Sequence, residues 1–390
     1  MKIAHRVADI QPFHVMALLA RARSLQEQGY DVIHLEVGEP DFDTPAPIVA
    51  AGVEALHRGK THYTPATGLP ILREVIAEYY SERFGVDVSP QRIVVTTGAS
   101  GALSLVTAAL FNPTDRVMLA DPGYPCNSHF LRLIGARSQW VATDAEARFQ
   151  LSAAAAVEHW RDDTAGILVA TPSNPTGTLL SLAELHDLHE VVRERGGVLI
   201  VDEIYQGLTY GVESCTALSL PRAEQDIVVI NSFSKYFGMT GWRLGWIVAP
   251  QDLVPALDKL AQNFYLAPPT PSQYAALAAF TPSTLAILDE RRNELHKRRD
   301  YLLKALPALG FKIPVIPEGA FYLYCDISEL GDDSFALCEA LLEQAHVAVT
   351  PGKDFGFRDA ARYLRIAYTA PIPRLQEAVA RIARHLKVSV

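Results

Sequence analysis

The sequence predicts an α/β fold: a large domain with a mostly parallel (mixed) sheet flanked by helices, and a smaller α+β domain built from the N- and C-terminal segments. Between about residues 92 and 250, short apolar runs alternate with amphipathic helical stretches, which is the pattern of a parallel sheet covered by helices. Several runs are apolar throughout, as strands covered on both faces are. After about residue 285, a charged helical pattern leads into a mixed tail, which indicates the second unit.

The predicted elements follow in chain order. Residues 1–45 hold a helix at about 15–29, an apolar run at 32–37 and a turn-rich stretch at 38–41, and we expect this segment to pack with the small domain. The large domain is predicted over residues 46–285, with strands at 92–96, 116–120, 166–170, 198–201, 227–230 and 244–249. The small C-terminal domain is predicted over residues 286–390, with a helix at 288–309 and a further run at 319–325.

Length, composition and charge exclude several classes of protein. A chain of 390 residues has room for two or three domains, and 49% hydrophobic with 20% charged residues is typical of a folded protein. The net charge of -9 and the lack of a basic stripe argue against a nucleic-acid partner. The N-terminus has no signal-peptide pattern, and no run approaches the ~18 apolar residues of a membrane span. We therefore expect a cytoplasmic protein with no membrane partner.

The sequence predicts no metal site. The four cysteines form no C-x-x-C pair, so neither a disulfide framework nor a zinc ribbon is indicated, and we expect buried, reduced thiols at Cys126, Cys215, Cys325 and Cys338. His186 and His189 lie three residues apart on a predicted helix, but no H-E-x-x-H motif or cysteine accompanies them. We expect these two histidines to face solvent or to cap the helix.

Polar residues that follow the predicted strands are the candidates for a site, because open parallel sheets bind ligands beyond the carboxyl ends of their strands. Gly98, Ala99 and Ser100 open a helical stretch, where small residues leave backbone N–H groups accessible to an anion; simple helix capping is the alternative. Tyr124 follows the second strand, where a lone aromatic residue more often serves packing than function. Asn174 follows the third strand and offers an amide.

Two adjacent acidic residues follow the strand at 198–201, and Tyr205 comes two residues later. A buried, unpaired carboxylate is costly, so Asp202 needs a cation, a metal or hydrogen-bond donors. The alternative gives the functional role to Glu203 and makes Asp202 a helix cap. The residues alone leave both interpretations open.

The strand at 227–230 leads into Ser232, Ser234 and Lys235, and Arg243 comes eight residues after the lysine. Serine, lysine and arginine side chains suit an anion, and a lysine beside apolar residues can act as a nucleophilic amine, although surface lysines also follow strands. Together the strand ends offer an anion-binding helix start, an amide, a carboxylate and a lysine with an arginine. Pyridoxal 5'-phosphate requires such a set.

These residues lie in ordered motifs that cover nearly the whole chain. The motifs are Val37-Gly38-Glu39-Pro40-Asp41-Phe42, Tyr63-Thr64-Pro65, Asn174-Pro175-Thr176-Gly177, Asp202-Glu203-Ile204-Tyr205, Ser232-Phe233-Ser234-Lys235, Gly241-Trp242-Arg243-Leu244-Gly245 and Leu364-Arg365-Ile366. Each motif is weak alone, but the ordered set resembles the class I/II aminotransferases, the aspartate aminotransferase-like fold-type I family of pyridoxal-phosphate enzymes.

The resemblance implies a role for each residue. Lys235 would form the Schiff base with the cofactor and shuttle the substrate proton, while Asp202 would pair with the pyridinium nitrogen. Tyr205 and Asn174 would donate to the ring oxygen, and Tyr124 would stack on the ring, so that the predicted catalytic set is Lys235, Asp202, Tyr205 and Tyr124. The cofactor phosphate would be held by Gly98, Ala99, Ser100, Ser232, Ser234 and Arg243, with Tyr63 reaching it across a homodimer interface.

The same resemblance implies how the substrate binds. Arg365 would form a two-pronged contact with the substrate α-carboxylate, a role that lysine would fill poorly, and the N–H of Gly38 and the side chain of Asn174 would assist. The active sites would be shared between the two subunits of a homodimer.

The implied function is a pyridoxal-phosphate-dependent aminotransferase that moves an α-amino group from an L-amino acid to a 2-oxo acid by a ping-pong mechanism. A C–S β-lyase or a decarboxylase on the same fold is the nearest alternative, because these enzymes share Lys235, Asp202 and Arg365. A cofactor-binding regulatory protein is a remote alternative. Such a regulator needs a DNA-binding module before the fold, whereas the fold's own motif begins here by Gly38.

One departure from the family bears on the substrate. A bacterial aspartate-using subgroup carries a lysine where this chain has Ser100, so that route to a side-chain carboxylate is missing. The segment that resembles the family's substrate cover carries Ile10, Phe13 and Val15, and we expect Tyr265 and Leu266 to line the same space. These residues favour a neutral, aliphatic or aromatic amino donor, with a 2-oxo acid such as 2-oxoglutarate as acceptor.

Overall fold

The computed structural model describes residues 1, 3–8, 10 and 14–388. In that part of the chain the core is a seven-stranded sheet with the strand order β2-β8-β7-β6-β5-β3-β4. β8 runs opposite to the other six strands of this sheet, which are parallel to one another, so the predicted large, mostly parallel sheet is confirmed. The strands are β2 (Ile93–Thr96), β3 (Arg116–Asp121), β4 (Arg137–Ala142), β5 (Thr164–Ala170), β6 (Val198–Asp202), β7 (Ile227–Ser232) and β8 (Gly245–Val248).

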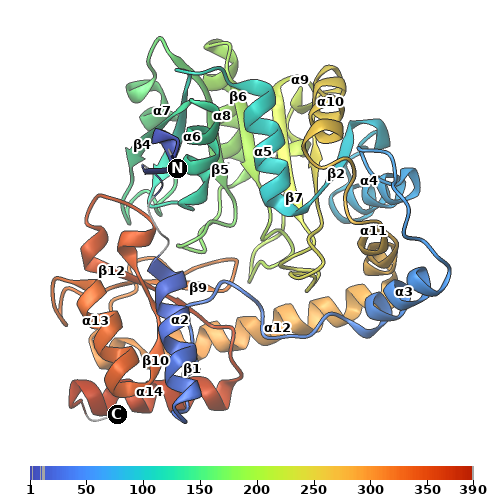
Figure 1. The fold of residues 1–390 in the computed structure, drawn as a ribbon. Coiled ribbons are helices and arrows are strands. Elements are labelled where there is room, and N and C mark those ends of the chain that lie inside the picture. Colours follow the sequence, from blue (N-terminus) through green and yellow to red (C-terminus); the bar gives the residue numbers. More distant parts are fainter. Residues whose placement is uncertain (2, 9, 11–13, 389–390) are drawn as a thin grey trace.

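Helices cover both faces of this sheet, as its apolar strands predict (Figure 1). On β5, Ile167 joins the apolar cluster that includes α8 (Leu182–Glu194), whereas Leu168 joins the cluster that includes α5 (Gly98–Leu110). Successive strand residues point to opposite faces, so a strand buried on both sides must be apolar at every position. Burial of both faces holds the strand ends, and the polar residues that follow them, in fixed positions.

The remaining helices surround the sheet and connect it to the C-terminal part (Figure 1). The long helix α12 (Pro282–Ala305) begins six residues before the predicted position, and a short 3₁₀ turn at 307–309 replaces its predicted last turn. The other helices are α1 (His5–Ala8), α2 (His14–Glu27), α3 (Ala46–His57), α4 (Pro70–Phe84), α6 (Cys126–Ile134), α7 (Ala153–His159), α9 (Ala223–Asp226), α10 (Val254–Phe264), α11 (Thr270–Ala276), α13 (Ser334–Ala340) and α14 (Ile372–Leu386).

The N- and C-terminal segments build the smaller unit together. β1 (Ile33–His34) pairs in parallel with β10 (Val347–Ala348), and α2 packs on this pair through an apolar cluster. A second, antiparallel sheet has the order β11 (Thr350–Pro351), β12 (Tyr363–Ala367), β9 (Tyr322–Asp326). The predicted α+β unit from both chain ends is therefore confirmed. Its boundaries at residues 45 and 285 stay a prediction, and α12 runs through the second of them.

Two sequence expectations need correction. His189 is fully buried rather than solvent-facing or capping, because its Nε2 bonds the carboxylate of Asp226; His186 is partly exposed. Of the four free cysteines, Cys325 and Cys338 are buried as expected, but Cys126 and Cys215 are partly exposed. In the described residues no group of His, Cys, Asp and Glu side chains is placed to hold a metal ion, and no helix is long and apolar enough to cross a membrane.

Candidate active site

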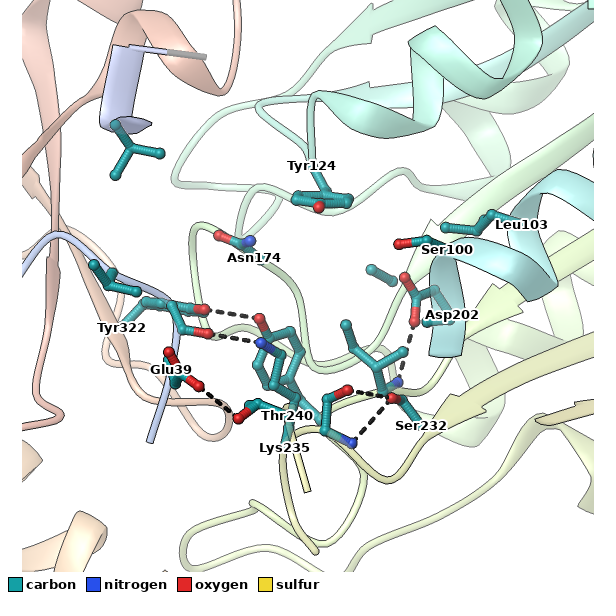
Figure 2. Close-up of a pocket in the computed structure, with 18 of the residues that line it drawn as sticks. Glu39, Ser100, Leu103, Tyr124, Asn174, Asp202, Ser232, Lys235, Thr240 and Tyr322 are labelled. Carbon is teal, nitrogen blue, oxygen red and sulfur yellow. Dashed lines mark hydrogen bonds between the residues drawn. The ribbon is translucent and has the colours of Figure 1, made fainter. Parts of the chain in front are cut away.

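A cavity of about 440 Å³ lies at the carboxyl ends of β5, β6 and β7, between the large sheet and the smaller unit (Figure 2). Parallel strands bring their carboxyl ends to one edge, so residues far apart in sequence meet there. Twelve of the predicted site residues line this cavity: Gly38, Ala99, Ser100, Tyr124, Asn174, Asp202, Tyr205, Ser232, Ser234, Lys235, Arg243 and Arg365.

Lys235 follows β7 and projects into the cavity (Figure 2). Its Nζ donates a hydrogen bond of 2.6 Å to the carbonyl of Gly38 and lies 6.0 Å from the centre of the Tyr205 ring. Burial lowers the pKa of this amine to about 8, since a buried ammonium loses hydration. A larger fraction of the amine is therefore unprotonated near neutral pH than in an exposed lysine, as a nucleophile requires.

Asp202 ends β6, is 3% exposed and lines the cavity. Its Oδ1 accepts a hydrogen bond of 3.1 Å from the backbone N–H of Ile204, and burial raises its pKa to about 7. Glu203 is also buried but does not line the cavity. Its carboxylate accepts hydrogen bonds from the Ala217 N–H at 2.7 Å and from the side chains of Gln206 and Thr216. The structure thus places Asp202, and not Glu203, at the cavity.

Arg365 on β12 is 2% exposed and forms the wall opposite the large sheet. Its Nη1 donates to Asn174 Oδ1 at 2.8 Å, and its Nη2 donates to the carbonyl of Glu36. The guanidinium lies between two rings, 4.3 Å from the centre of Tyr322 and 4.7 Å from that of Phe355. Its Nε has no hydrogen-bond partner in the described part of the chain, so this buried cation retains a donor for a ligand.

The start of α5 and the turn after β7 form a cradle of donors. Ala99 and Ser100 lie in the first turn of α5, where backbone N–H groups have no partner within the helix. The hydroxyls of Ser232 and Ser234 are 3.0 Å apart. A Cβ at Gly98, which has a φ of +73°, would lie 2.8 Å from Nη2 of Arg243, so glycine lets this cation approach the helix start.

Other predicted residues lie elsewhere. Tyr63 is 81% exposed and does not line the cavity, nor does Gly98. Tyr265 and Leu266 also lie outside it, contrary to expectation, because they follow α10, where Tyr265 packs against the apolar cluster shared with α5. In the N-terminal segment, Val15 lines the cavity and Ile10 a neighbouring one, while Phe13 lies outside the described residues.

Sequence reasoning missed several cavity residues. Tyr322 on β9 shares a hydrogen bond of 2.7 Å with the Tyr205 hydroxyl, and Glu39 accepts a hydrogen bond from Thr240 (Figure 2). The other missed side chains are apolar and include Met16, Leu19, Leu103 and Ile204. Helical spacing from Val15 is the signal that could have found Leu19, four residues later on α2, and Met16 lies three residues before Leu19.

Comparisons with known proteins decide the family. Residues 30–382 match the profile of the family described as aminotransferase class I and II. The chain belongs to this family. The valine–pyruvate aminotransferase of Mycobacterium tuberculosis is 38% identical over 379 residues, which cover 97% of each chain. The aspartate aminotransferase of Bacillus subtilis is 33% identical over 394 residues, which cover 99% of each chain.

Solved structures agree with the sequence relatives. The crystal structure of an aminotransferase from Mycobacterium tuberculosis matches with a TM-score of 0.94 at 37% identity, over 99% of each chain. This protein is accordingly an aminotransferase, a transferase that acts on an amino group, and its fold is that of the aspartate aminotransferases. The lyase, decarboxylase and regulatory alternatives are not favoured by these relatives.

Proposed function

We propose that this aminotransferase depends on pyridoxal 5'-phosphate and moves the α-amino group of an L-amino acid to a 2-oxo acid in a ping-pong cycle. The observation that carries the proposal is one cavity that gathers a lysine amine, a buried carboxylate and an arginine–serine cradle at a helix start. The bound cofactor supplies an aldehyde that bonds to amines and a cationic ring that withdraws electrons from the substrate Cα.

The donor and acceptor groups of the cavity fit this cofactor. Asp202 is a carboxyl group whose pKa is raised by burial, and a ring N–H⁺ would supply a partner that favours its charged form. At the other end, Ser232, Ser234, Arg243 and the first N–H groups of α5 offer the donors and the positive charge that a phosphate needs.

The side chains of the cavity then have distinct tasks. Lys235 binds the cofactor and afterwards accepts the proton that leaves the substrate Cα, which its lowered pKa favours. Asp202 would hold the proton on the ring nitrogen. Tyr205 and Asn174 would donate to the ring oxygen, and Tyr124 would pack on the ring. Arg365 fixes the substrate carboxylate, so that the Cα–H bond lies within reach of Lys235.

The cavity also supports a neutral amino donor. Its cations are Lys235, Arg243 and Arg365, and each has a task already; no other lysine, arginine or histidine of the described residues lines it. Glu39 adds a negative charge, and α2 contributes apolar side chains. A donor with an aliphatic or aromatic side chain therefore fits better than aspartate. The same argument favours an acceptor without a second carboxylate, such as pyruvate, over the 2-oxoglutarate expected from sequence.

A homodimer is part of the proposal, because α3 is apolar on two sides. Ile48, Gly52 and Ala55 face the interior, while Val49, Val53 and Leu56 are 41–56% exposed. A helix with an outer apolar face is typical of an interface. Other exposed apolar side chains are Tyr63, which follows α3 in the sequence, and Ile71, Phe264 and Leu266. In such a dimer, Tyr63 would reach the partner's phosphate site.

The first test is the visible absorption of the protein reconstituted with pyridoxal phosphate, before and after single L-amino acids are added without an acceptor. We expect a visible band that fades with neutral amino acids and returns when a 2-oxo acid follows. Lys235→Ala should lose multiple-turnover transamination altogether, since no other amine lines the cavity in the described residues. A band that persists while pyruvate and ammonia accumulate would instead indicate β-elimination.

Sedimentation of the purified protein tests the dimer. We expect a dimer for the wild type and a shift toward monomer for Val53→Glu, which places a charge in the exposed apolar face of α3. The substitution Glu54→Gln on the same helix serves as the control, because that side chain is exposed and paired with Arg58 outside the apolar face. A monomeric, fully active wild type would contradict shared active sites. The cytoplasmic location stays a prediction.

A further inference from the structure

Tyr322 contacts two separate parts of the candidate site. It begins β9, is fully buried and lines the cavity (Figure 2). Its hydroxyl lies 2.7 Å from the hydroxyl of Tyr205, while its ring lies 4.3 Å from the guanidinium carbon of Arg365. One side chain thus touches both the tyrosine assigned to the cofactor ring oxygen and the arginine assigned to the substrate carboxylate.

Gly38 confines the Tyr322 hydroxyl from a third side. A Cβ built on Gly38 would lie 2.3 Å from Oη of Tyr322, but 3.4 Å from the ring carbon that bears this oxygen. The hydroxyl oxygen is therefore what makes glycine necessary at this position. The carbonyl of Gly38 also accepts the hydrogen bond from Lys235, so the contact reaches the catalytic amine.

The proton count of the two phenols fixes the direction of their hydrogen bond. Each phenol has one proton to donate. If Tyr205 donates its proton to the cofactor ring oxygen, it must accept the proton of Tyr322. The positive charge of Arg365 over the Tyr322 ring strengthens this donor, because it stabilises negative charge on the phenol oxygen.

We propose that Tyr322 is a positioning residue that couples the carboxylate site at Arg365 to the ring-oxygen hydrogen bond of Tyr205. Its hydrogen bond orients the Tyr205 proton toward the ring oxygen. A carboxylate bound to Arg365 offsets the positive charge and so weakens the donor strength of Tyr322. This inference rests on the proposed function, since it assumes that Tyr205 donates to pyridoxal phosphate. Asn174, which also contacts Arg365, provides a parallel link that stays intact when Tyr322 is changed.

The decisive variant is Tyr322→Phe, which removes the hydroxyl and keeps the ring under Arg365. The readout is the pH midpoint of the visible band of the cofactor-loaded protein. We expect the midpoint to rise by about 0.3 to 1 pH unit, because a weaker Tyr205 donor leaves the ring oxygen more electron-rich. The charged groups around Lys235, namely Glu39, Asp202, Arg243 and Arg365, are unchanged in this variant.

The matched control is Tyr368→Phe. Tyr368 is as fully buried as Tyr322, but it does not line the cavity, and its hydroxyl faces the carbonyl of Ala320. Its substitution should leave the midpoint at the wild-type value. If Tyr322→Phe also kept the wild-type midpoint, the inference would be overturned while the proposed function stood. A wild type with no visible band would overturn the proposed function itself.

A carboxylate without an amino group tests the coupling to Arg365. We expect 3-methylbutanoate to shift the pH midpoint of the visible band in the wild type. The shift should be smaller in Tyr322→Phe, because only the through-space effect of Arg365 and the link through Asn174 remain in that variant. Combination with Tyr205→Phe separates the routes further. Because Tyr322 acts through Tyr205, the double variant should have the midpoint of Tyr205→Phe alone. Additive shifts, or equal shifts by the carboxylate in both proteins, would contradict the coupling.

A cofactor-independent measurement tests the position of the hydroxyl. Gly38→Ala should lower the thermal unfolding midpoint, because the new methyl group meets Oη of Tyr322. Adding Tyr322→Phe should restore most of the loss, since the nearest ring atom then lies at an ordinary contact distance. Loss that Tyr322→Phe does not restore would show that the hydroxyl is not held against Gly38, and the inference would fail.

Discussion

Asp202 and Glu203 are adjacent carboxylic acids in one polypeptide segment, and burial raises the pKa of both, to about 7 and about 8. They differ in what surrounds them. Glu203 accepts hydrogen bonds from a backbone N–H, an amide and a hydroxyl, so the protein satisfies it internally. Asp202 has one backbone donor and faces the cavity. A shifted pKa thus does not distinguish a structural carboxyl group from a functional one. The distinction comes from the missing hydrogen-bond donors and from the cavity beside Asp202.

Two buried arginines show the same contrast between a charged group that the protein pairs internally and one that faces the cavity. Arg298 on α12 is 3% exposed and pairs with the carboxylates of Asp41 and Glu294. Arg365 is 2% exposed, yet in the described residues no acidic side chain pairs with it and its Nε has no partner. A buried cation without a counter-charge is costly. The fold tolerates it here because the cavity admits a substrate carboxylate, in the proposed function.

The largest expected effect separates the two acids by catalysis. Asp202→Asn removes the charge that we assign to the ring nitrogen, and kcat/KM for a neutral donor should fall by about 1,000-fold, or about 4 kcal/mol in the transition state. Glu203→Gln, one residue away, should stay within about threefold of the wild type, because Glu203 does not touch the cavity. The reverse ranking of the two variants would mean that the functional acid is Glu203.

The second effect separates them by stability. Glu203→Ala removes the acceptor of three buried donors, of which the Gln206 amide keeps a second acceptor at the carbonyl of Cys215, and the free energy of unfolding should fall by about 3 kcal/mol. Urea unfolding of the cofactor-free protein measures this. Glu203→Gln keeps an acceptor oxygen and the side-chain volume and should lose less, which makes it the control. If Glu203→Ala had the same free energy of unfolding as the wild type, these hydrogen bonds would make no net contribution to stability.

The strand-end residues were predictable because each one follows a strand that its own neighbouring sequence predicts. Asp202, Lys235 and Asn174 each follow an apolar run, and parallel strands bring these residues together at one edge of the sheet. Residues brought in from the smaller unit were not predictable this way. Tyr322 reaches the cavity only because β9 and β12 pack against the large sheet, and nothing near it in sequence marks that contact.

The burial of polar residues could not be predicted from the sequence either. His189 is buried and its Nε2 forms a hydrogen bond with the carboxylate of Asp226, 37 positions later, and no pattern around His189 encodes that partner. β4 was missed because its residues alternate between exposed and buried at the edge of the sheet, which gives a weaker signal than the apolar runs of β6 and β7.

The third effect is a pH dependence. Glu203 holds its proton in the folded protein up to about pH 8, whereas the unfolded chain releases it near its ordinary pKa. Between these values the folded state binds more protons, so stability falls as pH rises, by at most about 1.4 kcal/mol per pH unit. Glu203→Gln cannot titrate. The stability advantage of the wild type over this variant should therefore shrink from about pH 5 to pH 8 in urea unfolding. A constant difference would contradict a raised pKa.

The smallest effect removes one partner of Glu203 and leaves the acid in place. Thr216 is fully buried and donates a hydrogen bond of 3.0 Å to Glu203 Oε2, which also accepts one from Gln206. Thr216→Val keeps the shape and should cost about 1 to 2 kcal/mol of unfolding free energy, because Glu203 Oε2 retains its second donor but the N–H of Leu218 loses the hydroxyl that accepts its hydrogen bond. Thr216→Ser restores the hydroxyl and should recover most of the hydrogen-bond contribution. Neither variant should change kcat/KM, since Thr216 lies off the cavity. A catalytic loss in Thr216→Val would mean that the hydrogen bonds of Glu203 position Asp202. Glu203 would then contribute to catalysis as well as to stability, and the two acids would differ only in the size of that contribution.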